Sequence, residues 1–597
     1  MRCRQGKACL HPVYRDGAMM EKVFCNPLNL EYRYQIKDAL TGKGVFREAA
    51  DPTMVVFKGK YLLFCSMSGG FWYSDDVYDW KFHETPELPI YHYAPDVREV
   101  NGQIVFCASH RGEACKIYRS PDPLHVPFKE VSAPFAFWDP DIFQDEDGRV
   151  YLYWGCSSKE PLYGMELNPE TLEPMGEKKA MFGENVAQHG WERKGENNVV
   201  PPPKKFRDYM MRLIMGTKPF IEGAYVNKVN GKYYLQYAAP GTEVNVYADG
   251  VYVSDSPLGP WEYQRHNPFS SVPGGFMNGA GHGSTFQDKE GKWWHISTMR
   301  ISVNENFERR IGLFPCDFDK DGILHCNQNF ACYPQRLAHD VKRIAPDMNL
   351  LSYAATTSAS SFQTGFEPNF GVDENCRTWW AAENADADPW YQIDLGEVKT
   401  VKAIQVNFAD HKVPMIPLDK KNSYRDTVGY RIIKVQPQKT AYLLEGSADG
   451  ENWVTLKDNR NENTDYTHDL TVRSEALRLR YLRLSHIEVA MGGVAAISGL
   501  RVFGRGNGTA PAPVEILRCV RSGDGLNLKL SWDKSDGAEG YNVRYGISPD
   551  KLYNSWQVIG KTELDLSTIN ADIQYWIAID SYNENGVTES SVFATMP

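Results

Sequence analysis

The sequence predicts an all-β chain in which a five-bladed β-propeller is followed by two β-sandwiches. One phrase recurs five times in the first 340 residues: a polar or acidic opener, a short strand, a Gly turn and an aromatic-rich strand. Repeats of this kind form blades around an axis. Helical periodicity is nearly absent, and two further units of short alternating strands follow residues 336–349.

The five phrases fix the positions of three acids. They begin at residues 51, 94, 139, 222 and 281 and read DPTMVVFKGKYLLFCS, APDVREVNGQIVFCAS, DPDIFQDEDGRVYLYWG, EGAYVNKVNGKYYLQYA and GHGSTFQDKEGKWWHIST. This spacing leaves each blade room for about four short strands. Three phrases open with a carboxylate, namely Asp51, Asp139 and Glu222. Because blades meet at the axis, we expect these acids to converge there, an arrangement typical of sugar chemistry.

The longest interval between openers contains an insertion at about residues 183–215. It is rich in polar residues, prolines and charges, which predicts a loop over one face of the propeller. The 12 Cys are scattered without a CxxC pair, so neither a zinc site nor a disulfide framework is expected. Cys65, Cys107 and Cys156 are predicted to fall in the second strands of three phrases, where we expect them to pack as small apolar residues.

Composition argues against two classes of partner. With a net charge of -11, a pI near 5.8 and no dense Lys/Arg cluster, we expect no binding to nucleic acid or to a membrane surface. No stretch approaches the roughly 20 apolar residues of a membrane helix. The start MRCRQGKACLHPVYRDG lacks an apolar signal-peptide core. This predicts a cytoplasmic protein, or a periplasmic or secreted one if translation starts at Met19 or Met20 or an export signal precedes this sequence.

The predicted boundaries are 1–345 for the propeller, 346–506 for the first sandwich and 507–597 for the second. In the first sandwich TWWAA, WYQIDLG, SADGENW and RYLRL follow one another. This order resembles the discoidin-like (coagulation factor 5/8 type C) module, which is common in carbohydrate-binding proteins. The resemblance implies a structural calcium near Asp373 and Thr378, although DEN stands here where the module usually has DGN.

The last unit resembles a fibronectin type III domain through Trp532, Tyr541 and Tyr575, which are core residues in that fold. The Gly/Pro-rich stretch GRGNGTAPAP precedes it, and Gly-rich linkers behave as flexible chain. We therefore expect a spacer that is loosely attached to the rest of the chain.

The five phrases resemble glycoside hydrolase family 43 in their order along the chain and in their opening residues. Members of that family are inverting enzymes with a five-bladed propeller. The resemblance covers about residues 26–340. It implies that Asp51 is the general base, that Asp139 orients the site and tunes its pKa values, and that Glu222 is the general acid. The family often reads EGP where this chain has Glu222-Gly223-Ala224. Because Glu222 is kept, this departure bears on loop shape more than on chemistry.

The physical requirements of inversion agree with these roles. One carboxylate deprotonates a water and one protonated carboxyl releases the leaving oxygen, at a separation of roughly 6.5–9.5 Å. An acid in such a site needs a raised pKa, which the charge of Asp139 would give to Glu222. The competing acids near the openers are Asp141, Asp145 and Asp147 beside Asp139, and Asp96 in the second phrase.

The family resemblance also implies roles for other residues of the propeller. His282 in GHGS corresponds to a histidine at the axis, which either holds a calcium ion, mostly through water, or hydrogen-bonds a catalytic carboxylate. Of Arg309 and Arg310, one is expected to reach sugar hydroxyls and the other to be a solvated ion-pair partner. Phe71 and Trp72 are candidates for an apolar wall of the sugar site, with core packing as the alternative.

These expectations describe an inverting exo-glycosidase, an α-L-arabinofuranosidase or β-xylosidase, that removes terminal pentoses from plant polysaccharide side chains or oligosaccharides. No cofactor is required for the chemistry, and a structural calcium is the expected ion. A galactofuranosidase or galactanase uses the same propeller with different pocket loops. The alternatives from other classes are a non-catalytic carbohydrate-binding propeller and an adhesive scaffold built on the two C-terminal units.

Overall fold

The structure is a computed structural model, and it describes residues 22–39, 42–89, 93–110, 112–203, 209–210, 212, 216–417, 424–426, 429–434, 436 and 438–595. Strands make up nearly all of its regular structure, so the predicted all-β class is confirmed. Short 3-10 turns occur at η1 (Gly190–Glu192), η2 (Glu196–Asn198), η3 (Pro368–Gly371) and η4 (Ala490–Gly492). No helix in these ranges is long and apolar enough to cross a membrane.

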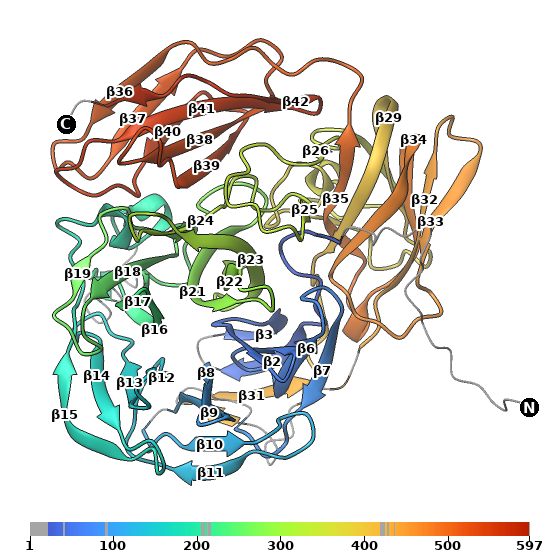
Figure 1. Cartoon of the computed structure of the whole chain (residues 1–597). Helices are drawn as coiled ribbons and strands as arrows, with labels where there is room; N and C mark the ends of the chain where they lie inside the picture. Colours follow the sequence, from blue (N-terminus) through green and yellow to red (C-terminus); the bar gives the residue numbers. More distant parts are fainter. Residues whose placement is uncertain are drawn as a thin grey trace, which may run out of the picture.

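Five antiparallel sheets of consecutive strands follow one another around a common centre (Figure 1). Each contains one of the predicted phrases, in which the Gly turn joins the first two strands. The first sheet contains β4 (Thr53–Phe57), β5 (Lys60–Phe64), β6 (Gly70–Ser74) and β7 (Trp80–Glu84). The second contains β8 (Tyr93–Val100), β9 (Gln103–Ser109), β10 (Ile117–Ser120) and β11 (Lys129–Ser132).

The other three sheets of the propeller have the same order. The third contains β12 (Asp141–Gln144), β13 (Val150–Trp154), β14 (Tyr163–Leu167) and β15 (Pro174–Ala180). The fourth contains β16 (Glu222–Val229), β17 (Lys232–Ala239), β18 (Ala248–Ser254), β19 (Glu262–Tyr263) and β20 (Ser270–Ser271). The fifth contains β21 (Asn278–Gln287), β22 (Trp293–Arg300), β23 (Arg309–Phe318) and β24 (Leu324–Cys326).

Each of the five phrases has a residue in the left-handed backbone conformation at its first or second position. Asp51, Ala94, Asp139, Gly223 and His282 all have φ between 46° and 66°, in the left-handed region. This region is unfavourable for residues other than Gly, and Asp tolerates it better than most. Because such strain clusters at functional sites, the shared geometry directs attention to the centre of the propeller.

Two small sheets connect distant parts of the chain. β1 (Val23–Phe24) pairs with β25 (Gln335–Arg336). β2 (Arg33–Ala39) and β3 (Gly42–Glu48) form a hairpin, and β2 also pairs with a second hairpin made of β30 (Tyr424–Asp426) and β31 (Gly429–Lys434). The second hairpin is an excursion of the first sandwich, so that unit extends a sheet at the start of the propeller.

The first sandwich is built on two long strands. β29 (Tyr391–Phe408) and β34 (His468–Glu488) pair through two register shifts, which let them bend around a core containing Trp380, Tyr391 and Leu482. The remaining strands are β26 (Asn349–Leu350), β27 (Thr356–Ala359), β28 (Trp380–Ala381), β32 (Ala441–Ser447), β33 (Trp453–Asp458) and β35 (Ala496–Arg505).

The last unit contains two sheets. One contains β36 (Leu517–Arg521), β37 (Leu528–Trp532) and β40 (Glu563–Leu566). The other contains β38 (Gly540–Gly546), β39 (Asn554–Ile559), β41 (Trp576–Asn583), β42 (Gly586–Thr588) and β43 (Phe593–Ala594). Trp532, Tyr541 and Tyr575 lie in its core, as the sequence predicts.

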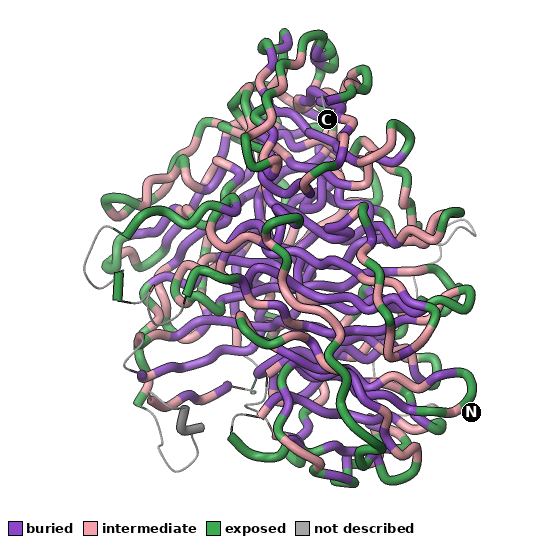
Figure 2. The backbone as a smooth tube through the Cα atoms, turned by 90° about the vertical axis from the view of Figure 1, so that its left-hand side faces the viewer, coloured by how far each residue is buried: buried purple, intermediate pink, exposed green. Residues whose placement is uncertain are grey.

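The last unit is not loosely attached, so the expectation of a free spacer is wrong. Its core cluster includes Val244 and Val246 of the propeller. In the 183–215 insertion, the N–H of Gly190 donates to the carbonyl of Ile569 at 2.9 Å. The ring of Tyr553 stacks on His325 at 3.9 Å. Buried backbone runs from this unit into the propeller, and exposed backbone forms turns at the rim (Figure 2).

The docked unit gives a first prediction. Val246→Ala removes two methyl groups at the junction and should lower the free energy of unfolding by about 2 kcal/mol. The matched control is Val520→Ala, because Val520 lies in the same unit but is 67% exposed. Thermal unfolding of both variants measures the difference. If they melt together at the wild-type temperature, the junction does not stabilise the fold.

Candidate active site

The three predicted acids lie at the axis ends of the first, third and fourth sheets. Asp51 precedes β4, Asp139 precedes β12, and Glu222 is the first residue of β16. The N–H of Asp51 donates to the Thr298 hydroxyl and that of Asp139 to the Ser109 hydroxyl, each at 2.8 Å. Neighbouring sheets thus fix the backbone at both left-handed residues.

Asp51 is held as a carboxylate. Its Oδ1 accepts a hydrogen bond from Nη1 of Arg309 at 2.9 Å, and its Oδ2 accepts one from the Ser66 hydroxyl at 2.6 Å. His282 Nδ1 lies 3.4 Å from the same Oδ1. Burial alone would raise the pKa of Asp51, but Arg309 and His282 outweigh it and lower the pKa below its ordinary value. An ionised carboxylate of this kind is suited to accept a proton.

His282 faces two of the acids. Its Nδ1 is also 3.9 Å from Oδ2 of Asp139. Burial lowers the pKa of His282, but Asp51, Asp139 and Glu222 outweigh burial and raise it above the ordinary value. Asp249 fixes the backbone here, because its carboxylate accepts hydrogen bonds from the N–H groups of His282 and Gly283. The alternative in which His282 contacts a catalytic carboxylate therefore has direct geometric support.

Asp139, Cys156 and Glu222 form a second cluster. One ligand atom from each lies within 4.8 Å of the other two. Oε1 of Glu222 accepts a hydrogen bond from the Tyr247 hydroxyl at 2.5 Å, and Oε2 accepts one from the Cys156 thiol at 3.1 Å. Cys65 and Cys107 are buried as the sequence predicts, but Cys156 is only half-buried and contacts an acid of the site.

The raised pKa in this cluster falls on Asp139. Burial raises it to about 7, and the carboxylates of Glu222 and Asp51 add to the effect while His282 opposes it. Asp139 therefore holds a proton through the acidic range and loses it near neutrality. Because Glu222 lies within 4.8 Å, this proton is stored beside the predicted general acid.

The competing acids have structural partners instead. The Asp96 carboxylate accepts a hydrogen bond from the N–H of Ile142, and the Asp141 carboxylate accepts one from the N–H of Val226. Each acid thereby links its sheet to the next. Asp145 is paired with Lys228 at 2.6 Å. Asp147 lies in an exposed turn beside Arg149. These contacts place all four in structural roles.

The two predicted arginines behave differently. Arg309 reaches Asp51 and Glu48, within the site. Arg310 is neither solvated nor at the site, so both roles expected for it are wrong. It is 1% exposed, and its Nε donates to Nε2 of His468 at 3.0 Å in the first sandwich. Side chains on β23 are buried on both faces of the strand. Arg310, the neighbour of Arg309, therefore lies in the interface between the propeller and the first sandwich.

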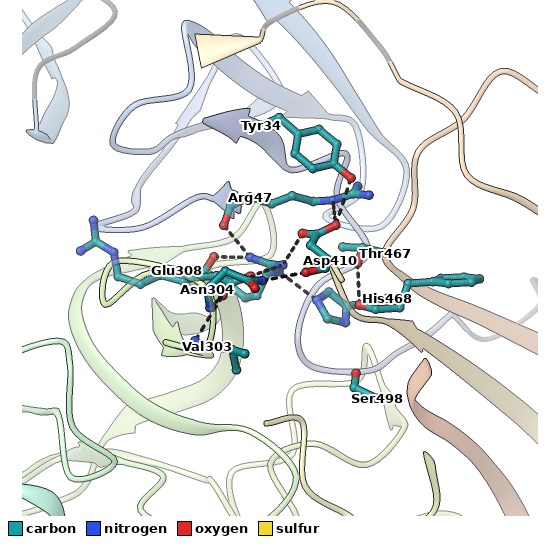
Figure 3. A network of polar contacts seen from close by, with 12 residues as sticks. Tyr34, Arg47, Val303, Asn304, Glu308, Asp410, Thr467, His468 and Ser498 are labelled. Atoms are coloured by element: carbon teal, nitrogen blue, oxygen red, sulfur yellow. Dashed lines mark hydrogen bonds and ion pairs between the residues drawn. The ribbon is translucent and has the colours of Figure 1, made fainter. Parts of the chain in front are cut away.

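That interface is a buried polar network (Figure 3). Arg47 of β3 pairs with Asp410 at 3.1 Å and with Asp465 at 2.8 Å. The Tyr34 hydroxyl also donates to Asp410, at 3.0 Å. Burial lowers the pKa of His468, and Arg310 adds to this effect, so the ring is neutral and accepts the arginine hydrogen bond. The propeller and the first sandwich are thus joined by ordered polar contacts.

Phe71 and Trp72 do not form a wall of the sugar site. They are 0% and 1% exposed and belong to two hydrophobic cores on opposite faces of β6. The alternative of core packing is correct. Exposed aromatic surface is instead available at Trp138, which directly precedes Asp139, and at Phe307, whose ring is 5.4 Å from the Arg309 guanidinium.

The predicted calcium site of the first sandwich offers few oxygen ligands. Oδ2 of Asp373 accepts the Thr378 hydroxyl at 2.7 Å, and burial raises the pKa of Asp373 to about 6. Glu374 turns away and pairs with Arg501. A calcium ion prefers six to eight oxygen ligands. Asp373 would therefore supply one carboxylate to a calcium ion, and carbonyl groups and waters would supply the other ligands. Calcium at this site and at His282 stays a prediction.

Comparison with known proteins agrees with the geometry. Residues 45–324 match the model of glycosyl hydrolases family 43. We call these residues the family 43 domain, after the family that they resemble. Residues 370–484 match a model described as a NedA-like, galactose-binding domain, of the F5/8 type C class, which confirms the discoidin-like resemblance of the first sandwich.

Three curated relatives match parts of this chain. The chain is 27% identical over 137 residues to a beta-xylosidase of Xylanibacter ruminicola, and 30% identical over 142 residues to a xylosidase/arabinosidase of Bacteroides ovatus. Each match covers 21% of this chain and 39% of the relative. A beta-D-galactofuranosidase of Aspergillus niger is 27% identical over 174 residues, which is 28% of this chain and 38% of that protein.

The pKa of Asp139 predicts how the family 43 domain responds to pH. Since Asp139 loses its proton near pH 7, kcat/KM should fall as pH rises through about 7.

The same proton makes the stability of the fold depend on pH. The folded state binds it more tightly than the unfolded chain, in which the pKa of Asp139 is 3.8, so stability is lost as pH rises from about 4 to 7. Asp139→Asn should remove that loss, at most about 4 kcal/mol. Thermal unfolding at pH 4 and pH 8 measures it. An unchanged pH dependence in the variant would rule out a buried proton on Asp139.

Proposed function

We propose that this chain is an inverting exo-glycosidase that removes terminal pentoses from plant polysaccharide side chains or oligosaccharides. The observation that carries the proposal is the convergence of Asp51, Asp139 and Glu222 in the family 43 domain, with Arg309 on Asp51 and His282 beside Asp51 and Asp139. The names of two bacterial relatives, a beta-xylosidase and a xylosidase/arabinosidase, support a pentose. We further propose that the five sheets are the five blades and that residues 507–597 form a fibronectin type III domain.

In this mechanism Asp51 is the general base. A water between Asp51 and the sugar attacks the anomeric carbon and gives its proton to the Asp51 carboxylate. Arg309 and the Ser66 hydroxyl each occupy one lone pair of an Asp51 oxygen, and a carboxylate oxygen has a second lone pair for the water. The positive charge beside Asp51 keeps it ionised until the water arrives.

Glu222 is the general acid of the same step. The bond from the anomeric carbon to the leaving oxygen breaks as that oxygen takes the proton of Glu222. Tyr247 and Cys156 hold the two carboxyl oxygens and thereby fix the direction of the transfer. Asp139 stores a proton within 4.8 Å and can restore it to Glu222 after turnover. Solvent then takes the proton from Asp51 and returns one to Asp139, which closes the cycle.

A galactofuranosidase is the second candidate, and the Aspergillus niger relative is the observation that favours it. The two activities share the acids and differ in the sugar that the pocket admits. Release of nitrophenol from α-L-arabinofuranoside, β-D-xyloside and β-D-galactofuranoside separates them. Release from a pentoside alone supports the first candidate. No release from any of the three would favour a non-catalytic carbohydrate-binding propeller.

The role of Glu222 predicts how its loss depends on the substrate. Glu222→Gln should reduce kcat about 100- to 10,000-fold on oligosaccharides, whose leaving groups need protonation, and far less on nitrophenyl glycosides. Asp147→Asn is the matched control, because it removes a carboxylate from an exposed turn of the phrase that contains Asp139. Steady-state rates on both substrate classes measure the effect. Equal losses on both would remove Glu222 from the acid role.

A further inference from the structure

The first sandwich contributes a buried arginine to the family 43 domain. Its hairpin β30–β31 pairs with β2, and in that register Arg431 lies opposite Lys37. The Arg431 side chain is buried, and its Nη1 donates to Oε1 of Gln35 at 2.8 Å. Its guanidinium also lies 5.7 Å from the ring of Tyr93, the first residue of β8. A residue nearly 400 positions from the first opener thus reaches the axis side of the propeller.

Arg431 faces a carboxylate that has unequal partners on its two oxygens. Glu48, the last residue of β3, is fully buried, and its Oε1 accepts hydrogen bonds from Nε and Nη2 of Arg309. Its Oε2 is buried and has no hydrogen-bond partner within the described residues. Nη1 of Arg431 lies 3.9 Å from that oxygen. Arg431 therefore supplies the positive charge that compensates the open side of Glu48.

Arg309 carries the effect onward to the catalytic base. The same guanidinium that binds Glu48 donates through Nη1 to Oδ1 of Asp51 at 2.9 Å. The four residues form an alternating chain of charges, Arg431, Glu48, Arg309 and Asp51, in which each member contacts the next. A change at one end alters the charge that Arg309 must share between its two carboxylates.

We propose that Arg431 is a positioning residue for the general base, so that the discoidin-like unit completes the active site of the propeller. The inference rests on the proposed function of Asp51. Without Arg431, Glu48 attracts Arg309 more strongly and Asp51 loses positive potential. Other titratable or charged groups face this chain and stay in place in the variants; they are His282, Asp139, Tyr247 and Cys65 near Asp51, and Tyr93 near Arg309.

The test is the acidic limb of the pH profile of kcat/KM, which reports the ionisation of the base in the free enzyme. Arg431→Gln should move this limb upward by about one pH unit, because a positive charge is lost near Asp51. Arg431→Lys keeps the charge and should restore the limb. Glu48→Gln combined with Arg431→Gln removes both charges and should also return the limb toward the wild-type position.

The matched control is Lys434→Gln, on the same strand as Arg431 and opposite Tyr34. It removes a positive charge from the hairpin and should leave the limb unchanged. If Arg431→Gln shifts the limb no more than Lys434→Gln does, the inference is wrong and the glycosidase assignment stands. A purely structural role would lower the amount of active enzyme in Arg431→Gln without moving the limb.

Thermal unfolding tests the same chain without turnover. Arg431→Gln should lower the melting temperature more in the wild-type background than in Glu48→Gln, because the open oxygen of Glu48 is then no longer a buried charge. Equal losses in both backgrounds would contradict the contact. If the wild-type chain hydrolyses no glycoside, the proposed function fails, and this cycle alone still decides whether Arg431 acts on Glu48.

Discussion

The guanidinium of Arg309 between two buried carboxylates is the interaction on which the candidate site depends. Asp51 and Glu48 are both removed from solvent, and a buried charge is costly unless it is paired and hydrogen-bonded. Arg309 satisfies both acids with one rigid fork, a geometry that a lysine does not offer. With Asp51 fixed as an anion, the proton of the site is left to the cluster around Asp139.

The domains that follow the propeller are parts of one packed molecule. The first sandwich extends the β2–β3 sheet and shares the network of Arg47 and Asp410, and the last unit covers Val246. Contacts of this kind tie the C-terminal half of the chain to the scaffold that positions Asp51 and Glu222. Substrate specificity and stability are therefore expected to respond to changes outside the family 43 domain.

The acids of the site were predictable because the repeat reports them. The recurring phrase places Asp51, Asp139 and Glu222 at the starts of three sheets, and the structure brings them together around His282 and Cys156. The exposed face of a strand was not predictable in the same way. Propeller sheets pack on both faces, so alternation along β6 did not separate a sugar-facing Trp72 from a core Trp72.

Contacts between units left still less signal in the sequence. Cys156 reads as an apolar strand residue, and only its position just beyond β13 brings the thiol to Glu222. Arg431 contacts Glu48 only after two hairpins pair across the fold. The composition of the linker also led to a wrong prediction. Packing of the last unit against the propeller, and not the linker, attaches this unit to the rest of the chain.

The most direct test of the account is the configuration of the sugar at the moment of release. Proton NMR during the first minutes of hydrolysis, before mutarotation, distinguishes the two anomers. The account predicts the inverted anomer, because Asp51 activates a water and forms no bond to the sugar. Release of the retained anomer would show a covalent glycosyl-enzyme and would contradict the role of Asp51 as a base.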